Sequence, residues 1–103
     1  MKKVYIVQVY LKEHDSTDIV DITLEPENVR DVINEYLHYR VQDAEEYGTE
    51  HHVQCEKEAM DEIWNFYKDY DFESRSVGST VSYGVHWFSI SVTVRTLYER
   101  TTL

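Results

Sequence analysis

The chain has 103 residues, of which 42% are hydrophobic and fourteen are aromatic, and this composition suits a single domain with a packed core. It excludes a disordered chain, because disordered chains are poor in aromatic and β-branched residues. The formal net charge of −10 argues against direct binding to nucleic acid or to a membrane surface, whose phosphates carry the same sign.

The negative charge is concentrated in the middle of the chain. Residues 42–73 carry eleven acidic side chains against only Lys57 and Lys68, a net charge of −9. The net charge of residues 1–41 is −3, and that of residues 74–103 is +2. We therefore expect an electrostatically two-sided molecule, and a partner that binds its acidic side should be basic.

Neither a membrane span nor a signal peptide is expected. The chain has no apolar run near the roughly 20 residues that cross a bilayer, and its first residues lack the apolar run of a signal peptide. The single cysteine, Cys55, has no partner for an intramolecular disulfide, which fits a reducing compartment. We therefore expect a cytoplasmic protein.

Two alternating segments at the start predict a β-hairpin. Between residues 3 and 12 every second residue is apolar, as in a half-buried strand: Tyr5, Val7, Val9 and Leu11. Residues 18–24 alternate again and place on one face Val20, Ile22 and Leu24. The polar residues 13–17 between the two segments predict the turn.

Two helices are predicted next. Pro26 suits the first helical position because its missing N–H would have no partner there, and Glu27 favours the positive end of the helix dipole. Apolar residues then recur three or four positions apart up to Gly48, which ends the helix: Val29, Val32, Ile33, Tyr36, Leu37, Val41 and Ala44. Thr49 is the expected N-cap of a second helix, which runs to about Tyr70 and has as its apolar side Val53, Met60, Ile63, Trp64 and Tyr67.

After Phe72 the composition favours strands. Residues 86–98 alternate most clearly, with one face made of Phe88, Ile90, Val92 and Val94 and an exposed face made of Trp87, Ser89, Ser91, Thr93 and Arg95. Residues 77–83 form the partner strand with a turn near Gly84, or else the turn lies at Gly78 and the last strand is longer. The order ββααββ predicts one α+β domain over residues 1–103, an antiparallel four-stranded sheet with two helices packed on one face.

No residue pattern indicates catalysis, a metal or a cofactor. His51 and Cys55 would share a helix face, as would His52 and Glu56, but a structural zinc site needs four ligands and no second Cys or His pair exists. A nucleophilic Cys55 would need a histidine far away in the sequence, and free intracellular cysteines are ordinarily buried and inert. No glycine-rich phosphate-binding loop occurs. We therefore expect a protein that is not an enzyme.

The remaining candidate site is the acidic, tyrosine-bearing helical region. We expect its partner-binding residues to be Glu45, Glu46, Tyr47, Glu50, Glu58, Asp61, Glu62, Asp69, Tyr70 and Asp71. One interpretation is a solvated face that only aids solubility. The other is a surface that imitates the phosphate array of a nucleic acid and docks into the basic groove of a nucleic-acid-binding protein.

Three functional hypotheses follow. The leading one is a non-enzymatic inhibitor or adaptor with a basic protein partner, and in its small size and acidity the chain is similar to inhibitors that phages and mobile elements use against restriction or CRISPR systems. The second is a homo-oligomeric structural or accessory domain, such as a homodimer through a sheet edge, in which the acids only solubilise. The third is a small-ligand binding domain whose pocket is lined by Tyr36, Tyr67 and Trp64.

Overall fold

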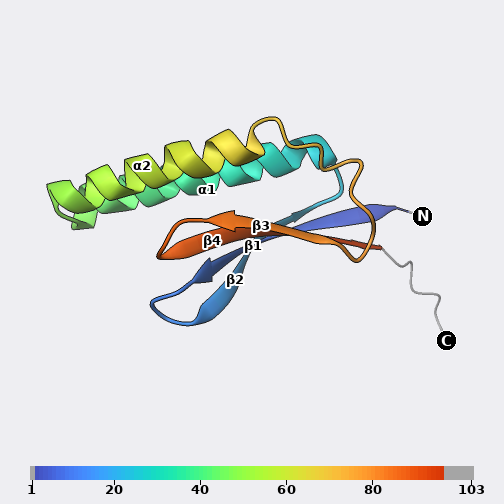
Figure 1. Cartoon of the computed structure of the whole chain (residues 1–103), viewed down its shortest axis with the longest axis horizontal. Coiled ribbons are helices and arrows are strands. Elements are labelled where there is room, and N and C mark those ends of the chain that lie inside the picture. Colours follow the sequence, from blue (N-terminus) through green and yellow to red (C-terminus); the bar gives the residue numbers. More distant parts are fainter. Residues whose placement is uncertain (1, 97–103) are drawn as a thin grey trace.

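The fold is described by a computed structural model that covers residues 2–96. The elements in chain order are β1 (Lys3–Leu11), β2 (Ser16–Thr23), α1 (Pro26–Tyr47), α2 (Glu50–Tyr67), β3 (Thr80–Gly84) and β4 (Phe88–Thr96). The strands form one antiparallel sheet in the order β2-β1-β4-β3, and the two helices lie side by side over one face of it (Figure 1). The predicted α+β fold and its element order are confirmed.

The core lies between the helices and the two central strands. The sheet contributes the alternating residues of β1 and β4, all of them at most 3% exposed: Tyr5, Val7, Val9, Phe88, Ile90, Val92 and Val94. The helices contribute residues three or four apart: Val29, Ile33, Leu37, Ala59, Ile63 and Tyr67. Each buried Val, Leu, Ile or Phe side chain contributes about 1.5–3 kcal/mol, so these faces fix which sides of the helices turn outward.

The connection between the helices is tight. Gly48 ends α1 in an extended conformation, and a Cβ atom on it would lie 2.3 Å from Nδ1 of His52 and 2.8 Å from the carbonyl oxygen of Ala44. The hydroxyl of Thr49 then accepts a hydrogen bond from the backbone N–H of His52 at 3.2 Å, the predicted N-cap. A side chain at position 48 would therefore displace the ring of His52 and crowd the carbonyl of Ala44.

The second helix is shorter than predicted. It ends at Tyr67 instead of about Tyr70, because the N–H of Tyr70 bonds back to the carbonyl of Tyr67 at 3.1 Å and turns the chain. The guanidinium of Arg30 in α1 then donates to the carbonyl of Tyr70. This bond fixes the start of the loop that leads to β3.

The predicted face of the second strand is wrong. A β-bulge between Val7 and Gln8 shifts the register, so that Val7 pairs with Asp21 while Gln8 pairs with Ile19. Ile22 pairs with Ile6 on the sheet face that the helices leave uncovered, and Ile22 and Leu24 are 52% and 47% exposed. Ile19 and Ile22 of β2 are therefore surface residues, whereas Val20 is half-buried and packs against the core.

The last hairpin turns near Gly84 as predicted, and the alternative turn at Gly78 is wrong. The turn comprises residues 85–87, and the carbonyl of Phe88 accepts a bond from the N–H of Val85 at 2.9 Å. Trp87 was expected on the exposed face of the last strand, but it precedes β4 and its indole nitrogen donates to Glu56 of α2. Residues 97 and 98, expected to continue this strand, lie outside the described residues.

The helix pair extends past the sheet. The described chain measures 54 × 30 × 19 Å, and at one end the hairpin of α1 and α2 projects beyond the strands (Figure 1). Val41 and Ala44 are buried in this part, outside the continuous core cluster. Neither helix of the described chain is long and apolar enough to cross a membrane.

A substitution at Gly84 tests the close approach in the β3–β4 turn. A Cβ atom there would lie 2.3 Å from Cα of Ser89 and 2.4 Å from the carbonyl oxygen of Phe88, both backbone atoms. Gly84→Ala should lower the free energy of unfolding by about 1–3 kcal/mol in urea titrations, because the backbone must shift. The exposed Ser82→Ala on the same strand should change it by less than about 0.5 kcal/mol. Equal stability of the two variants would contradict this account.

Candidate functional site

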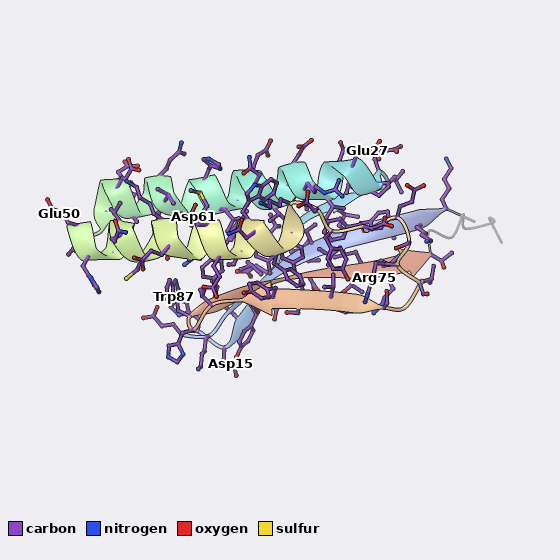
Figure 2. All side chains as sticks on the ribbon, turned by 45° about the horizontal axis from the view of Figure 1, so that its top comes forward. Asp15, Glu27, Glu50, Asp61, Arg75 and Trp87 are labelled. Carbon is purple, nitrogen blue, oxygen red and sulfur yellow. The ribbon has the colours of Figure 1, made fainter. Side chains whose placement is uncertain are left out.

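The structure distributes the predicted partner-binding residues along the helix layer. We use the name acidic helical face for this set of ten, which comprises Glu45, Glu46, Tyr47, Glu50, Glu58, Asp61, Glu62, Asp69, Tyr70 and Asp71. Nine of the ten side chains are exposed, and Tyr70 is half-buried. Figure 2 shows Glu50 at the projecting tip and Asp61 further along α2. The face is an extended array rather than a compact cluster.

The inward-facing residues of α2 determine this arrangement. Glu56, Ala59, Ile63 and Tyr67 are buried, and the 3.6-residue period turns Glu58 and Asp61 to the opposite side of the helix. The 18 residues of α2 extend over about 27 Å. The carboxylates of Glu50, Glu58, Asp61 and Asp69 are therefore spread along nearly the whole length of the helix.

Four members of the set have structural contacts. The carboxylate of Glu58 accepts a hydrogen bond from the side-chain amide of Gln54 at 3.2 Å, and that of Asp71 accepts one from the backbone N–H of Ser74 at 3.3 Å. Glu62 lies on the flank toward β3, where its carboxylate accepts a hydrogen bond from the hydroxyl of Tyr83 at 3.3 Å. Partial burial, and then the negative charge of Glu62, raise the pKa of Tyr83. The ring of Tyr70 packs 4.9 Å from that of Phe72 and 5.6 Å from that of Phe66. Of the two predicted tyrosines, only Tyr47, 77% exposed at the tip, is free to meet a partner.

The first helix adds acids that the sequence analysis did not include. Asp31 and Glu35 are exposed, four residues apart on the side of α1 opposite the buried Ile33 and Leu37. Glu27 is exposed at the start of the same helix, in view along the helix layer (Figure 2). Their position opposite the apolar stripe could be predicted from the sequence, but residues 1–41 carry a net charge of only −3, so the predicted binding residues were limited to residues 42–73.

The exposed acids of the helices form no ion pair with a lysine or arginine among residues 2–96. Within residues 2–96, the ion pairs are those of Arg40 and His52, and both involve the buried Glu56. No lysine or arginine of this part of the chain forms an ion pair with a carboxylate of the acidic helical face. The carboxylates along the helix pair therefore interact mainly with solvent.

A buried cluster, which we call the clamp, consists of Arg40, Glu56, Trp87 and Phe88. Arg40 of α1 donates two hydrogen bonds to the carboxylate of Glu56 in α2, each 2.9 Å long. The indole N–H of Trp87 donates to the same carboxylate at 2.9 Å, and the guanidinium carbon of Arg40 lies 3.8 Å from the ring centroid of Phe88. The clamp ties both helices to the end of the sheet.

The charged and polar groups of the clamp find hydrogen-bond partners within it, although they are largely shielded from solvent. Glu56 is 2% exposed, and the side chain of Arg40 is 18% exposed. Burial disfavours the charged guanidinium, but the hydrogen bonds to Glu56 and Tyr36 outweigh it and the pKa of Arg40 is raised. Arg40 therefore keeps its charge, and this charge is engaged with Glu56.

The histidines and the cysteine of α2 form two side-chain pairs. Sγ of Cys55 lies 3.6 Å from Nε2 of His51, and Nε2 of His52 lies 3.7 Å from the carboxylate of Glu56. Within the part of the chain that the structure describes, no three metal-binding side chains come together. Two adjacent pairs on one helix leave most of a coordination shell unfilled.

The three residues expected to line a small-ligand pocket do not share a hollow. Tyr67 is fully buried, and its hydroxyl donates to the backbone carbonyl of Ile90. Tyr36 lines an open groove of about 410 Å³ between α1 and β2, but Trp64 and Tyr67 do not. The position that we expected to be a pocket is filled by the core.

Comparison with known protein families, with curated proteins and with solved structures finds no match to this chain.

The clamp predicts a large interaction energy between Arg40 and Glu56. Glu56→Ala should lower the free energy of unfolding by about 3–5 kcal/mol, because it leaves the buried guanidinium without its partner. The double variant Arg40→Met/Glu56→Gln removes both charges and keeps an acceptor for Trp87, so it should be more stable than Glu56→Ala. Urea titrations of Glu56→Ala, of the single variants Arg40→Met and Glu56→Gln, and of the double variant measure these differences. A double variant that is as unstable as the sum of its single variants would show that the two side chains act independently.

Proposed function

We propose that this protein is a non-enzymatic inhibitor or adaptor that binds a basic surface of a nucleic-acid-binding protein through its acidic helical face. The observation that carries the proposal is the row of exposed carboxylates along the helix pair, with no lysine or arginine of the described chain paired to them. A basic surface would supply the missing counter-charges.

The electrostatics favour a partner over mere solvation. Unopposed carboxylates repel one another and weaken the folded state, and that repulsion is relieved when a basic surface covers them. A soluble surface does not require this arrangement, because interspersed charges of both signs keep a protein soluble. The row of like charges is therefore best explained by binding.

The projecting tip provides an anchor for such an interface. Tyr47 is 77% exposed, and the acidic residues Glu45, Glu46 and Glu50 surround it in the sequence. Tyrosines are enriched at interface cores, where their rings are buried and their hydroxyls find partners. A basic groove that accepts the tip would bury the ring of Tyr47 and place positive charges next to Glu45, Glu46 and Glu50.

Charge reversal tests the proposal directly. The variant Glu58→Lys/Asp61→Lys/Glu62→Lys, used beside the unaltered chain as bait in a lysate of the native host, should no longer capture the nucleic-acid-binding proteins that the unaltered chain retains. Quantitative mass spectrometry of the two eluates measures the loss. Binding of the identified partner should also weaken steeply as salt rises from 0.1 M to 1 M, because the screening length falls from about 10 Å to about 3 Å.

The matched control carries the same change in net charge elsewhere. Glu13, Asp15 and Glu25 are exposed and lie outside both helices and outside β2, so Glu13→Lys/Asp15→Lys/Glu25→Lys should still capture the partner. Equal capture by both triple variants, or binding that is indifferent to salt, would refute the proposal. Failure of both would show that only the net charge matters.

A second candidate function is the homodimeric accessory domain, which the free edge of β3 favours. β3 is the outer strand on one side of the sheet, and its sequence Thr80–Gly84 contains no charged residue. Two copies could pair these edges antiparallel without bringing like charges together. In this case the acidic residues would face outward on both copies.

Sedimentation distinguishes the two candidates. If β3 joins two copies, Ser82→Lys should shift the chain from dimer to monomer, because two lysines would meet across the paired edges. Thr17→Lys places the same charge on the opposite edge strand, β2, and should leave the dimer intact. A chain that is monomeric at every accessible concentration without any substitution would exclude the dimer.

A further inference from the structure

The other edge of the sheet has a different surface. β2 is the outer strand on its side, and within residues 2–96 no strand pairs with its outer edge. Three exposed large hydrophobic side chains lie on or just after β2: Ile19 at 58%, Ile22 at 52% and Leu24 at 47%. An edge strand with exposed apolar residues is a template for pairing with another chain.

The groove between α1 and β2 runs along this strand. Val9, Leu11 and Val20 provide its apolar lining from the sheet, and Tyr36 and Tyr39 provide its aromatic lining from the helix. Tyr39 is 59% exposed. A chain paired with β2 would therefore have a hydrophobic groove beside it for the side chains that point toward α1.

The charge of the groove is negative. Asp18 of β2 and Asp43 of α1 line it, and both are exposed. Arg40 also lines it, but its guanidinium is held by the two hydrogen bonds to Glu56. Tyr39 and Asp43 are four residues apart, so they lie on the same side of α1 and place an aromatic ring next to a carboxylate. This combination suits a lysine or arginine side chain, which stacks on the ring and pairs with the acid.

The same charges argue against a second copy of β2 as the occupant. β2 has the sequence STDIVDIT, with Asp18 and Asp21 and no basic residue. Antiparallel pairing of two such strands would bring aspartates of both copies near one another, and like charges across strands destabilise a sheet. The complementary strand must come from a partner with basic residues.

We propose that β2 and the adjoining groove bind an extended basic peptide segment of another protein, which adds to the sheet as a fifth strand. The peptide backbone pairs with the free edge of β2. Its side chains alternate, so that every second one enters the groove, where apolar residues contact Val9, Leu11 and Val20 and a lysine or arginine lies between Tyr39, Asp43 and Asp18. The eight residues of β2 set a peptide length of about six to eight residues.

This surface goes beyond the proposed function and does not depend on it. It uses the flank of α1 that faces β2 and an edge strand, whereas the acidic helical face uses the tip, the outer side of α2 and the loop after it. Variants in one surface leave the other unchanged, so the two proposals can fail separately.

The test begins with a library of random linear eight-residue peptides displayed on phage and selected against the immobilised full chain. We expect the enriched peptides to alternate β-branched or aromatic residues with Lys or Arg. The most enriched sequence is then synthesised with a fluorescent label, and its dissociation constant is measured by anisotropy. Replacing a central residue of the peptide with proline, at unchanged charge, should abolish binding because a strand hydrogen bond is lost.

Variants inside and outside the groove show where on the protein the peptide binds. Asp18→Asn/Asp43→Asn and Tyr39→Ser should each weaken binding at least tenfold, and all three positions are exposed, so the fold should tolerate the changes. Glu45→Gln/Tyr47→Ser changes the same residue types nearer the end of α1, outside the groove, and should alter binding less than twofold. The triple lysine variant of Glu58, Asp61 and Glu62 should also retain binding to a peptide held chiefly by β2.

Several results would overturn the proposal. They are the absence of peptide enrichment over a protein-free surface, peptides without basic residues, and binding that is equal in the groove variants and in the unaltered chain. A concentration-dependent dimer that Tyr39→Ser dissociates would show that a second copy occupies the groove instead. Loss of peptide binding in the triple lysine variant alone would assign the peptide to the acidic helical face.

Discussion

One buried carboxylate joins the three parts of this molecule. Glu56 of α2 accepts hydrogen bonds from Arg40 of α1 and from Trp87 of the β3–β4 turn, and Arg40 lies over Phe88 at the start of β4. A shift of either helix by one residue would leave a buried charge without its partner, at a cost of about 3–5 kcal/mol. The clamp therefore fixes which sides of the helices face outward. Because Glu56 faces the core, Glu58 and Asp61 on the other side of α2 face solvent. Because the guanidinium of Arg40 is hydrogen-bonded to Glu56, the charges that the groove along β2 presents are those of Asp18 and Asp43.

Much of the fold follows from periodicity and from the residues that end each element. The apolar stripes between Val29 and Ala44 and between Phe88 and Val94 match the buried faces, because burial of a continuous face is what both patterns encode. The bulge at Val7 could not be predicted, since alternation alone does not reveal an extra residue that inverts the faces of a strand. The position of Ile22 on the uncovered face was missed for this reason.

The candidate sites were predictable to different degrees. Exposure of Glu58 and Asp61 follows from the stripe of α2, and the sequence predicted it. The burial of Glu56 did not follow, because acidic residues are almost never fully buried unless paired, and the partner Arg40 lies sixteen residues away in another helix. Trp87 was predicted on the exposed face of the last strand, because alternation along a strand does not reveal a hydrogen bond to Glu56 in a helix far away in the sequence. The groove along β2 depends on the bulge and on the clamp together, so no local sequence signal could have revealed it.

The part of the helical hairpin beyond the clamp is a separate packing unit. Val41 and Ala44 are buried there but do not belong to the continuous core, and about two turns of each helix extend past Arg40 and Glu56. Local unfolding of this segment disrupts few buried contacts and leaves the sheet intact, so its free energy of opening lies below that of the whole domain. We therefore expect amide protons near the tip to exchange with solvent through local opening, and those of Ile33 and Ile63 to exchange only when the whole domain unfolds. A protein that grips the tip would slow the first process and stabilise the whole chain less than its contact area suggests.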